Sequence, residues 1–140
     1  MIKRLCQMAA AIPLAGLIAL GLSALGTPIH AEAPGTPTGI TAKLLSEIEL
    51  MKEFEEVGDR RLRMRVLTVP KGGRVAEHSH VDRPSLEYVL SGTATEFNDG
   101  QERTVQAGDA ITADHTTVHA WRNDTDGDLV ILAVDIYDPQ

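Results

Sequence analysis

The stretch of sequence that decides the fold reads GGRVAEHSHVDRPSLEYVLSG and runs from Gly72 to Gly92. Within it, His78 and His80 are separated by one residue. On a β-strand, residues two positions apart point to the same face of the sheet. Two imidazoles that face the same way suit a metal cation, because neutral imidazole is a common ligand of divalent metals. This spacing also occurs without a metal, so the prediction of a metal site depends on the residues around it.

Short segments with strand character follow this stretch up to the C-terminus. They alternate apolar and polar residues or are short apolar runs, and turn residues such as Asn98-Asp99-Gly100 separate them. The almost continuous apolar run over residues 129–136 is typical of a central core strand. Such close, even spacing predicts an all-β sandwich or barrel. The expected strands are residues 86–90, 93–97, 102–105, 110–112, 118–122 and 129–136.

Two segments before the histidines carry further predictions. Residues 62–66 alternate apolar and basic side chains, the period of a half-buried strand, which places Arg63 and Arg65 on the solvent face. Residues 41–54 are ambiguous. Their apolar residues fit a helical stripe, while residues 47–50 alternate acidic and apolar side chains as in a strand.

A third candidate ligand, His119, lies far along the chain on a later predicted strand. Trp121 and Asn123 share its face by the same two-residue period. Two ligands close together and a third on a distant strand is how a β-barrel assembles a site across its interior. We therefore predict that His78, His80 and His119 face one cavity and bind a divalent metal ion.

Together, the residues around these histidines resemble the two motifs of the cupin superfamily. The first motif is Gly-x5-His-x-His, a glutamate, and an apolar stretch of the type YVLxG, matched at Gly72, His78, His80 and Tyr88–Gly92. The second is a Gly-Asp turn followed by His-x-x-x-Asn, matched at Gly108, Asp109, His119 and Asn123. The resemblance covers roughly residues 62–137, and Asp82-Arg83-Pro84 is similar to a group of small single-domain cupins.

This resemblance implies a single double-stranded β-helix, the cupin jelly-roll barrel, over residues 41–140. It favours a strand over a helix around residues 43–49, because small cupins begin with a strand that leads into the barrel. It also implies a homodimer that pairs through an edge strand. At the metal site it implies Fe(II) or Mn(II) as the favoured divalent ions, and imidazole does not exclude Zn, Ni or Cu.

The chain departs from the cupin motifs in two places. Ser85 stands where the family's glutamate ligand is usual, and Glu87 lies two residues later on the same face of the strand. Two ligand sets therefore stay open: three histidines with Glu87 as the acid/base residue, or three histidines together with Glu87. In the second motif, Thr112-Ala113-Asp114 replaces Pro-x-Gly, which predicts a remodelled turn before His119.

Three hypotheses about function follow from the predicted site. The first is an enzyme with dioxygenase-like chemistry, because a three-His site in cupin dioxygenases leaves positions on the metal for substrate and dioxygen. The second is a non-catalytic module that binds or senses a small ligand. The third is a cupin that has lost its metal. The fold by itself does not choose the reaction or the substrate.

Three side chains near the motifs are assigned ordinary structural roles. Trp121 is expected in the barrel core rather than in a pocket wall, because aromatic side chains dominate core packing. Arg83 is expected to pair with a surface acid rather than with a carboxylate ligand. His115 is expected in a solvated loop.

The N-terminal part of the sequence has the pattern of a secretory signal peptide over residues 1–31. Lys3 and Arg4 precede an apolar stretch, and small residues end at Ala31, which predicts cleavage there and a flexible leader over residues 32–40. An uncleaved membrane anchor is the alternative, because the apolar run is just long enough to span a bilayer. After cleavage we expect a periplasmic or secreted protein without stable membrane association.

Composition limits the class of partner. The formal net charge is -7, which argues against nucleic-acid binding, since that needs clustered Lys and Arg. The single cysteine, Cys6, would leave with the signal peptide, so the stability of the mature chain depends on its core and not on disulfides. The expected partners are a small-molecule ligand or substrate and a second copy of the chain.

Overall fold

Nine β-strands and one short 3-10 helix make up residues 35–139, the part of the chain that the computed structural model describes. The predicted all-β class is confirmed. The predicted signal peptide lies outside the described residues, and no helix within them is long and apolar enough to cross a membrane. The elements are β1 (Thr41–Glu49), η1 (Leu50–Lys52), β2 (Arg61–Val69), β3 (Arg74–Ser79), β4 (Ser85–Ser91), β5 (Thr93–Asn98), β6 (Gln101–Gln106), β7 (Ala110–Ala113), β8 (Val118–Arg122) and β9 (Leu129–Tyr137).

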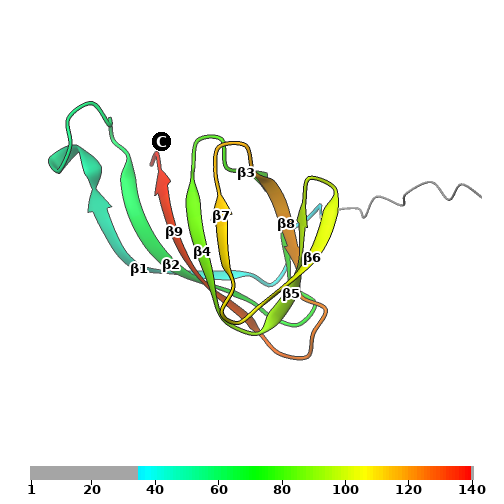
Figure 1. The fold of residues 1–140 in the computed structure, drawn as a ribbon. Helices are drawn as coiled ribbons and strands as arrows, with labels where there is room; N and C mark the ends of the chain where they lie inside the picture. Colours follow the sequence, from blue (N-terminus) through cyan, green and yellow to red (C-terminus); the bar gives the residue numbers. More distant parts are fainter. Residues whose placement is uncertain (1–34, 140) are drawn as a thin grey trace, which may run out of the picture.

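The strands form two antiparallel sheets that face each other (Figure 1). The larger sheet has the order β1-β2-β9-β4-β7, and the smaller has the order β3-β8-β5-β6. In both sheets, strands far apart in the sequence lie side by side: β9 lies between β2 and β4, and β8 lies between β3 and β5. This is the predicted jelly-roll barrel, and it places the third histidine beside the first two.

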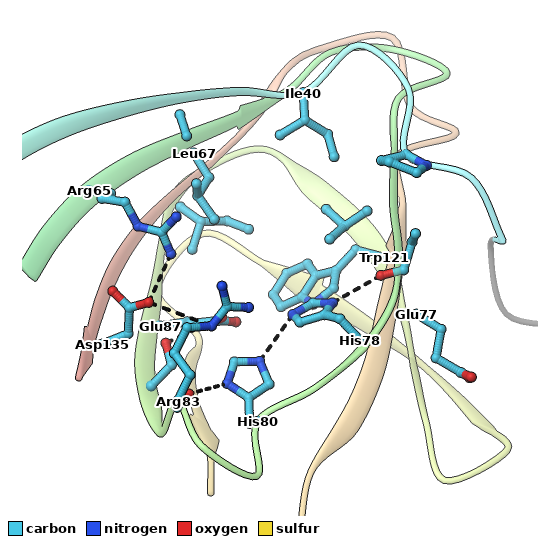
Figure 2. Close-up of a pocket in the computed structure, with 16 residues that line it drawn as sticks. Ile40, Arg65, Leu67, Glu77, His78, His80, Arg83, Glu87, Trp121 and Asp135 are labelled. Atoms are coloured by element: carbon cyan, nitrogen blue, oxygen red, sulfur yellow. Dashed lines mark hydrogen bonds and ion pairs between the residues drawn. The ribbon is translucent and has the colours of Figure 1, made fainter. Parts of the chain in front are cut away.

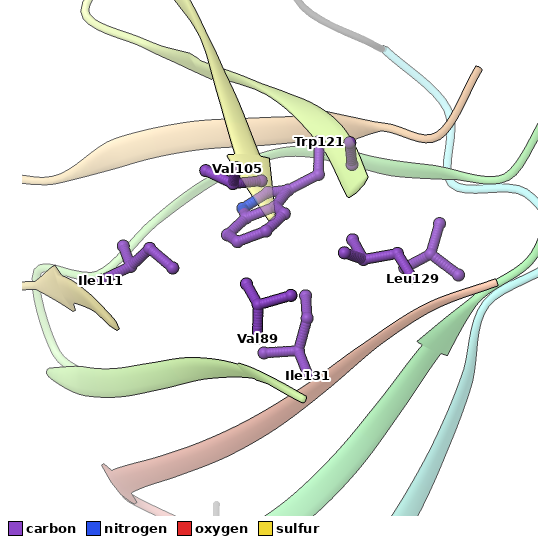
Figure 3. Close-up of a cluster of buried hydrophobic side chains, with 8 residues drawn as sticks. Val89, Val105, Ile111, Trp121, Leu129 and Ile131 are labelled. Carbon is purple, nitrogen blue, oxygen red and sulfur yellow. The ribbon is translucent and has the colours of Figure 1, made fainter. Parts of the chain in front are cut away.

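The hydrophobic core fills one end of the space between the sheets (Figure 3). Along β9 the inward side chains change from Leu129 and Ile131 at this end to Asp135 at the other. The inward side chains of β4 and β8 also change from apolar to polar along each strand. The buried polar side chains therefore gather at one end of the barrel. The core consists of Val69, Val89, Ala94, Val105, Ile111, Trp121, Leu129 and Ile131.

The inner face of β2 carries arginines, which corrects one prediction. The alternation on this strand places Arg63 and Arg65 in solvent, but both guanidiniums bind the carboxylate of Asp135, which is 1% exposed. Arg63 lies directly opposite Asp135 in the register of β2 and β9. The apolar side chains at positions 62, 64 and 66 therefore belong to the outer face of the sheet. Alternation gives the period of a strand, and the buried partner Asp135 decides which face is inside.

The ambiguity over residues 41–54 resolves in favour of a strand. β1 pairs with β2 along its length, which confirms the strand expected around residues 43–49. Most of its side chains are exposed. Backbone pairing rather than hydrophobic burial therefore holds β1, which explains why its apolar pattern fits two structures.

The end of the predicted leader over residues 32–40 has one backbone bridge to the barrel. Thr38 exchanges two backbone hydrogen bonds of 3.0 Å with Arg74 at the start of β3. Ile40 packs against the core cluster. Burial of this one apolar side chain and the short bridge hold the segment across the barrel.

Gly92, the last residue of the first motif, is required by the backbone. Its φ is +85°, and a Cβ at this position would collide with the carbonyl oxygen of Asp128. Only glycine fits such a close approach without strain. The predicted hairpin at residues 98–100 also forms, with positive φ at Asp99 and Gly100.

Candidate metal centre

Three histidine rings meet at the polar end of the barrel. His78 on β3 lies opposite His119 on β8, and His80 directly follows β3. Nε2 of His80 is 3.1 Å from Nε2 of His78 and 3.0 Å from Nε2 of His119. One ligand atom from each ring lies within 4.8 Å of the others. The structure thus brings together the three residues that the sequence singled out as a metal site.

The outer nitrogen of each ring has a hydrogen-bond acceptor. Nδ1 of His78 donates to the carbonyl oxygen of Ala76 at 2.9 Å, and Nδ1 of His80 donates to that of Arg83 at 2.8 Å. Burial lowers the pKa of His78 to about 4 and also lowers the pKa of His80, so both rings are neutral at pH 7. Since a neutral ring has one N–H, Nε2 carries a lone pair that points toward the other rings.

Glu96 on β5 binds the third ring, a role that neither motif indicates. Its Oε1 accepts a hydrogen bond of 2.8 Å from Nδ1 of His119, and its Oε2 accepts one from Nε of Arg103. Burial alone raises the pKa of Glu96, but these two hydrogen bonds outweigh burial and lower it. A carboxylate on Nδ1 fixes the tautomer and makes Nε2 a stronger ligand. The only sign of this role in the sequence is the position of Glu96: it lies two residues after Ala94, so both side chains are on the same buried face of β5.

The three inward nitrogens fit a divalent metal ion. Lone pairs that lie 3.0 to 3.1 Å apart repel each other, and a cation between them removes this repulsion. Two nitrogens that bind one ion at about 2.1 Å and at right angles lie about 3.0 Å apart, whereas a tetrahedral angle separates them by about 3.4 Å. The distances from His80 to His78 and from His80 to His119 therefore match neighbouring positions of an octahedron, and the ligand atoms of all three rings lie within 4.8 Å of one another. Imidazole binds Fe, Mn, Zn, Ni and Cu, so the rings alone do not choose the metal.

Glu87 lies outside this group of three. Its Oε1 accepts a hydrogen bond of 3.4 Å from Oγ of Ser85, and its Oε2 has no hydrogen-bond partner among the described residues. Both side chains are buried on the inner face of β4, and burial raises the pKa of Glu87. The three histidines form a group by themselves, and Glu87 is a separate buried carboxyl group.

The turn before His119 is built by the side chain of Asp114. Its Oδ1 accepts a hydrogen bond of 2.8 Å from the backbone N–H of Thr116. The carbonyl oxygen of Thr117 accepts one of 3.0 Å from the backbone N–H of His80. The turn that replaces Pro-x-Gly is therefore held by an Asx-type hydrogen bond, and it connects the second motif to the first.

Residues 65–135 match the sequence model of a family described as cupin domain. The chain belongs to the cupin family. Among curated proteins, quercetin 2,3-dioxygenase of Bacillus subtilis (strain 168) is 38% identical over 56 residues, which are 40% of this chain. The cupin covers only 17% of the length of that enzyme.

Solved structures share the cupin barrel. A cupin 2 conserved barrel domain protein from Salinispora arenicola CNS-205 aligns with a TM-score of 0.55 at 20% identity, over 93% of this chain and 92% of that chain. KdgF from Halomonas sp. aligns with a TM-score of 0.58 at 20% identity, over 78% and 89% of the two chains. At this identity the similarity concerns the fold alone.

Glu96→Gln is expected to weaken metal binding by this cupin about 10- to 100-fold, because it removes the charge that strengthens His119 as a ligand. Competition with a chromophoric chelator measures the affinity. Glu102→Gln is the matched control, since Glu102 is exposed on the neighbouring strand β6. Equal affinities in both variants would show that Glu96 serves only the fold.

A pocket of about 320 Å³ opens beside the histidines of the cupin barrel (Figure 2). Trp121 forms part of both this pocket and the core, so its two alternative roles both apply. Its ring contacts that of His119 edge to face, with centroids 5.9 Å apart. The apolar wall also includes Ile40, Leu67, Val75 and Ile131, and the polar wall includes Arg65, Arg83, Glu87 and Asp135.

Arg83 points into this pocket and not toward a surface acid, which corrects the prediction. Its Nε lies 3.7 Å from Oδ2 of the buried Asp135. The reason is local: the backbone N–H of Arg83 donates to the carbonyl oxygen of His80 at 3.0 Å, and this tight turn directs the side chain inward. His115 is exposed in its loop, as expected.

Proposed function

We propose that this cupin binds one divalent metal ion through His78, His80 and His119 and presents it to a small, oxygen-containing ligand in the adjacent pocket. The observation that carries the proposal is the convergence of three Nε2 lone pairs beside that pocket. The bound ion would act as a Lewis acid and oxygen activator, with Fe(II) or Mn(II) favoured. The partial similarity to quercetin 2,3-dioxygenase supports dioxygenase-like chemistry.

Residues around the three histidines have separate tasks in this proposal. Glu87 lines the pocket and has one oxygen without a hydrogen-bond partner in the described part of the chain, and its raised pKa allows it to hold a proton or take one from the ligand. Trp121 and the other apolar side chains exclude water from the ligand. Glu96 keeps His119 in the tautomer that the metal needs.

A binding or sensing module without turnover is the second candidate. The chain covers a small part of the dioxygenase that it resembles, and a pocket with bound metal also captures a ligand without chemistry. In that case Glu87 would orient the ligand by a hydrogen bond and would transfer no proton.

Anaerobic loading with Fe(II) or Mn(II), elemental analysis and oxygen uptake with diols, diketones and thiols test these alternatives. We expect one metal ion per chain and oxygen consumption with at least one class of compound. Glu87→Gln should keep the metal and lose at least about 100-fold in turnover, as expected for loss of a general acid or base. Metal-loaded protein that binds a compound saturably without oxygen uptake would establish the module instead.

We also propose that the chain forms a homodimer, through the outer face of the larger sheet and not through the edge strand that the resemblance implies. Three large apolar side chains of β4, Leu86, Tyr88 and Leu90, are exposed there, and the outward positions of β2 and β9 beside them are apolar. Contiguous exposed apolar surface marks an interface, and two-fold pairing is the commonest arrangement. Light scattering should give a dimer for the wild type and a monomer for Leu86→Glu, and a monomeric wild type would contradict the proposal.

A further inference from the structure

One carboxylate in the pocket wall faces three guanidinium groups. Arg63 binds Asp135 with two hydrogen bonds, Nε to Oδ1 at 2.9 Å and Nη2 to Oδ2 at 2.8 Å. Arg65 donates a single hydrogen bond of 3.1 Å from Nη2 to Oδ2, and Nε of Arg83 lies 3.7 Å from the same oxygen. The single negative charge of Asp135 cannot neutralise all three guanidinium groups.

Arg65 and Arg83 line the pocket, and Arg65 has a buried donor without a partner among residues 35–139. Nε of Arg65 is buried and has no hydrogen-bond partner among the described residues. The side chains of Arg65 and Arg83 are 19% and 36% exposed, and both line the pocket (Figure 2). A guanidinium keeps its charge when buried, so a donor without a partner in this position is costly until an acceptor arrives.

The charges of the pocket side chains indicate which kind of ligand group would accept hydrogen bonds from Arg65 and Arg83. At the arginine end of the pocket, three arginines against Asp135 leave two positive charges when Glu87 is protonated and one when it is ionised, and Glu77 lines the pocket as an exposed carboxylate. This positive charge suits an anionic group on the ligand, and a single carboxylate brings less like charge beside Glu87 than a dianion does. A planar anion with two oxygens also matches the fork of a guanidinium.

We propose that the ligand of this cupin carries a carboxylate that Arg65 and Arg83 bind, while its apolar body contacts Trp121 and its other end faces the histidines. The position of that other end rests on the proposed metal function. The carboxylate subsite does not, since its residues are held by Asp135 and not by a metal.

Fluorescence of Trp121 tests the inference, because it is the only tryptophan of the chain and lines the pocket. The probes are 3,4-dihydroxyphenylacetate and its primary amide, titrated without oxygen into the full chain, once free of metal and once loaded with Zn(II). We expect the acid to bind about 10- to 100-fold more tightly than the amide in both states, as charge-assisted hydrogen bonds allow. Arg83→Gln and Arg65→Gln should lose about 10-fold in affinity for the acid and little for the amide.

The matched control is Arg60→Gln, which removes the same charge at a site outside this pocket. Arg83 is partly exposed, so Arg83→Gln tests the subsite even if Arg65→Gln fails to fold. Equal affinity for acid and amide in the wild type, or an undiminished preference for the acid in Arg83→Gln, would overturn the inference. A preference for the acid in protein that takes up no metal on incubation with Zn(II), Fe(II) or Mn(II), as shown by elemental analysis, would support the inference while refuting the proposed metal function.

Discussion

Replacing His119 with alanine is expected to abolish stoichiometric metal binding, and His78→Ala is expected to do the same. Each change removes one of three converging nitrogens and leaves the ion with two imidazole ligands. Because loss of an outer hydrogen-bond partner already weakens metal binding about 10- to 100-fold, loss of a ligand should cost more than about 100-fold. Elemental analysis after dialysis against a trace of free metal measures the occupancy.

His115→Ala is the matched control for this experiment. It removes the same side chain from the exposed loop just before β8, four residues from His119, and should retain one metal ion per chain. Full occupancy in both His119→Ala and His78→Ala would refute the metal site. Loss of metal in His115→Ala as well would show that occupancy reports on folding and not on the three ligands.

Asp135→Asn is expected to lower the free energy of unfolding by about 3 kcal/mol at pH 7. The change leaves the buried guanidiniums of Arg63 and Arg65 without their carboxylate, and breaking a buried ion pair typically costs about 3–5 kcal/mol. We expect the lower end of this energy range because the side chains of Arg63 and Arg65 are 17% and 19% exposed, so water can still partly solvate their charges. Urea unfolding measures the loss, and Asp82→Asn, a change at an exposed position, should cost little.

The same residue predicts how stability depends on pH. Burial raises the pKa of Asp135, but the hydrogen bond from Arg63 and the charges of Arg65 and Arg83 outweigh burial and lower it. The folded-state pKa is then below the unfolded value of about 3.9, so Asp135 contributes stability that is fully present above about pH 4. This contribution is lost as the pH falls through the folded pKa. The acid limb of the stability curve should be shallower in Asp135→Asn, and parallel curves would contradict this assignment.

The parts of the site that repeat a short pattern were predictable from the sequence. The His-x-His spacing and the distant His119 identify the three rings, because side-chain direction on a strand follows a period of two. Glu96 and Asp135 were not predictable, since a single acid in an apolar strand shows its role only when a partner from another strand is known. The inward position of Arg65 depends on the register of β2 against β9, which alternation alone does not contain.

The structure at the two departures from the cupin motifs was only partly predictable from the sequence. Ser85 and Glu87 share a face, as the two-residue period predicts, but which of them approaches the histidines depends on how far β4 extends along β9. The remodelled turn at Asp114 was expected, whereas the contact of its Thr117 with His80 was not, because these two residues are 37 positions apart. Long-range pairing of this kind needs the folded topology.

The position of His78 opposite His119 has a consequence for how the barrel opens. β3 is an edge strand, and its pairing with β8 is interrupted between Val75 and His78. An ion held by both rings would join the two strands where the backbone ladder resumes. Amide hydrogen exchange along β3 should then slow when metal is present. Metal-free chains would release this edge more often, and a free edge is where strands of separate molecules pair and aggregate.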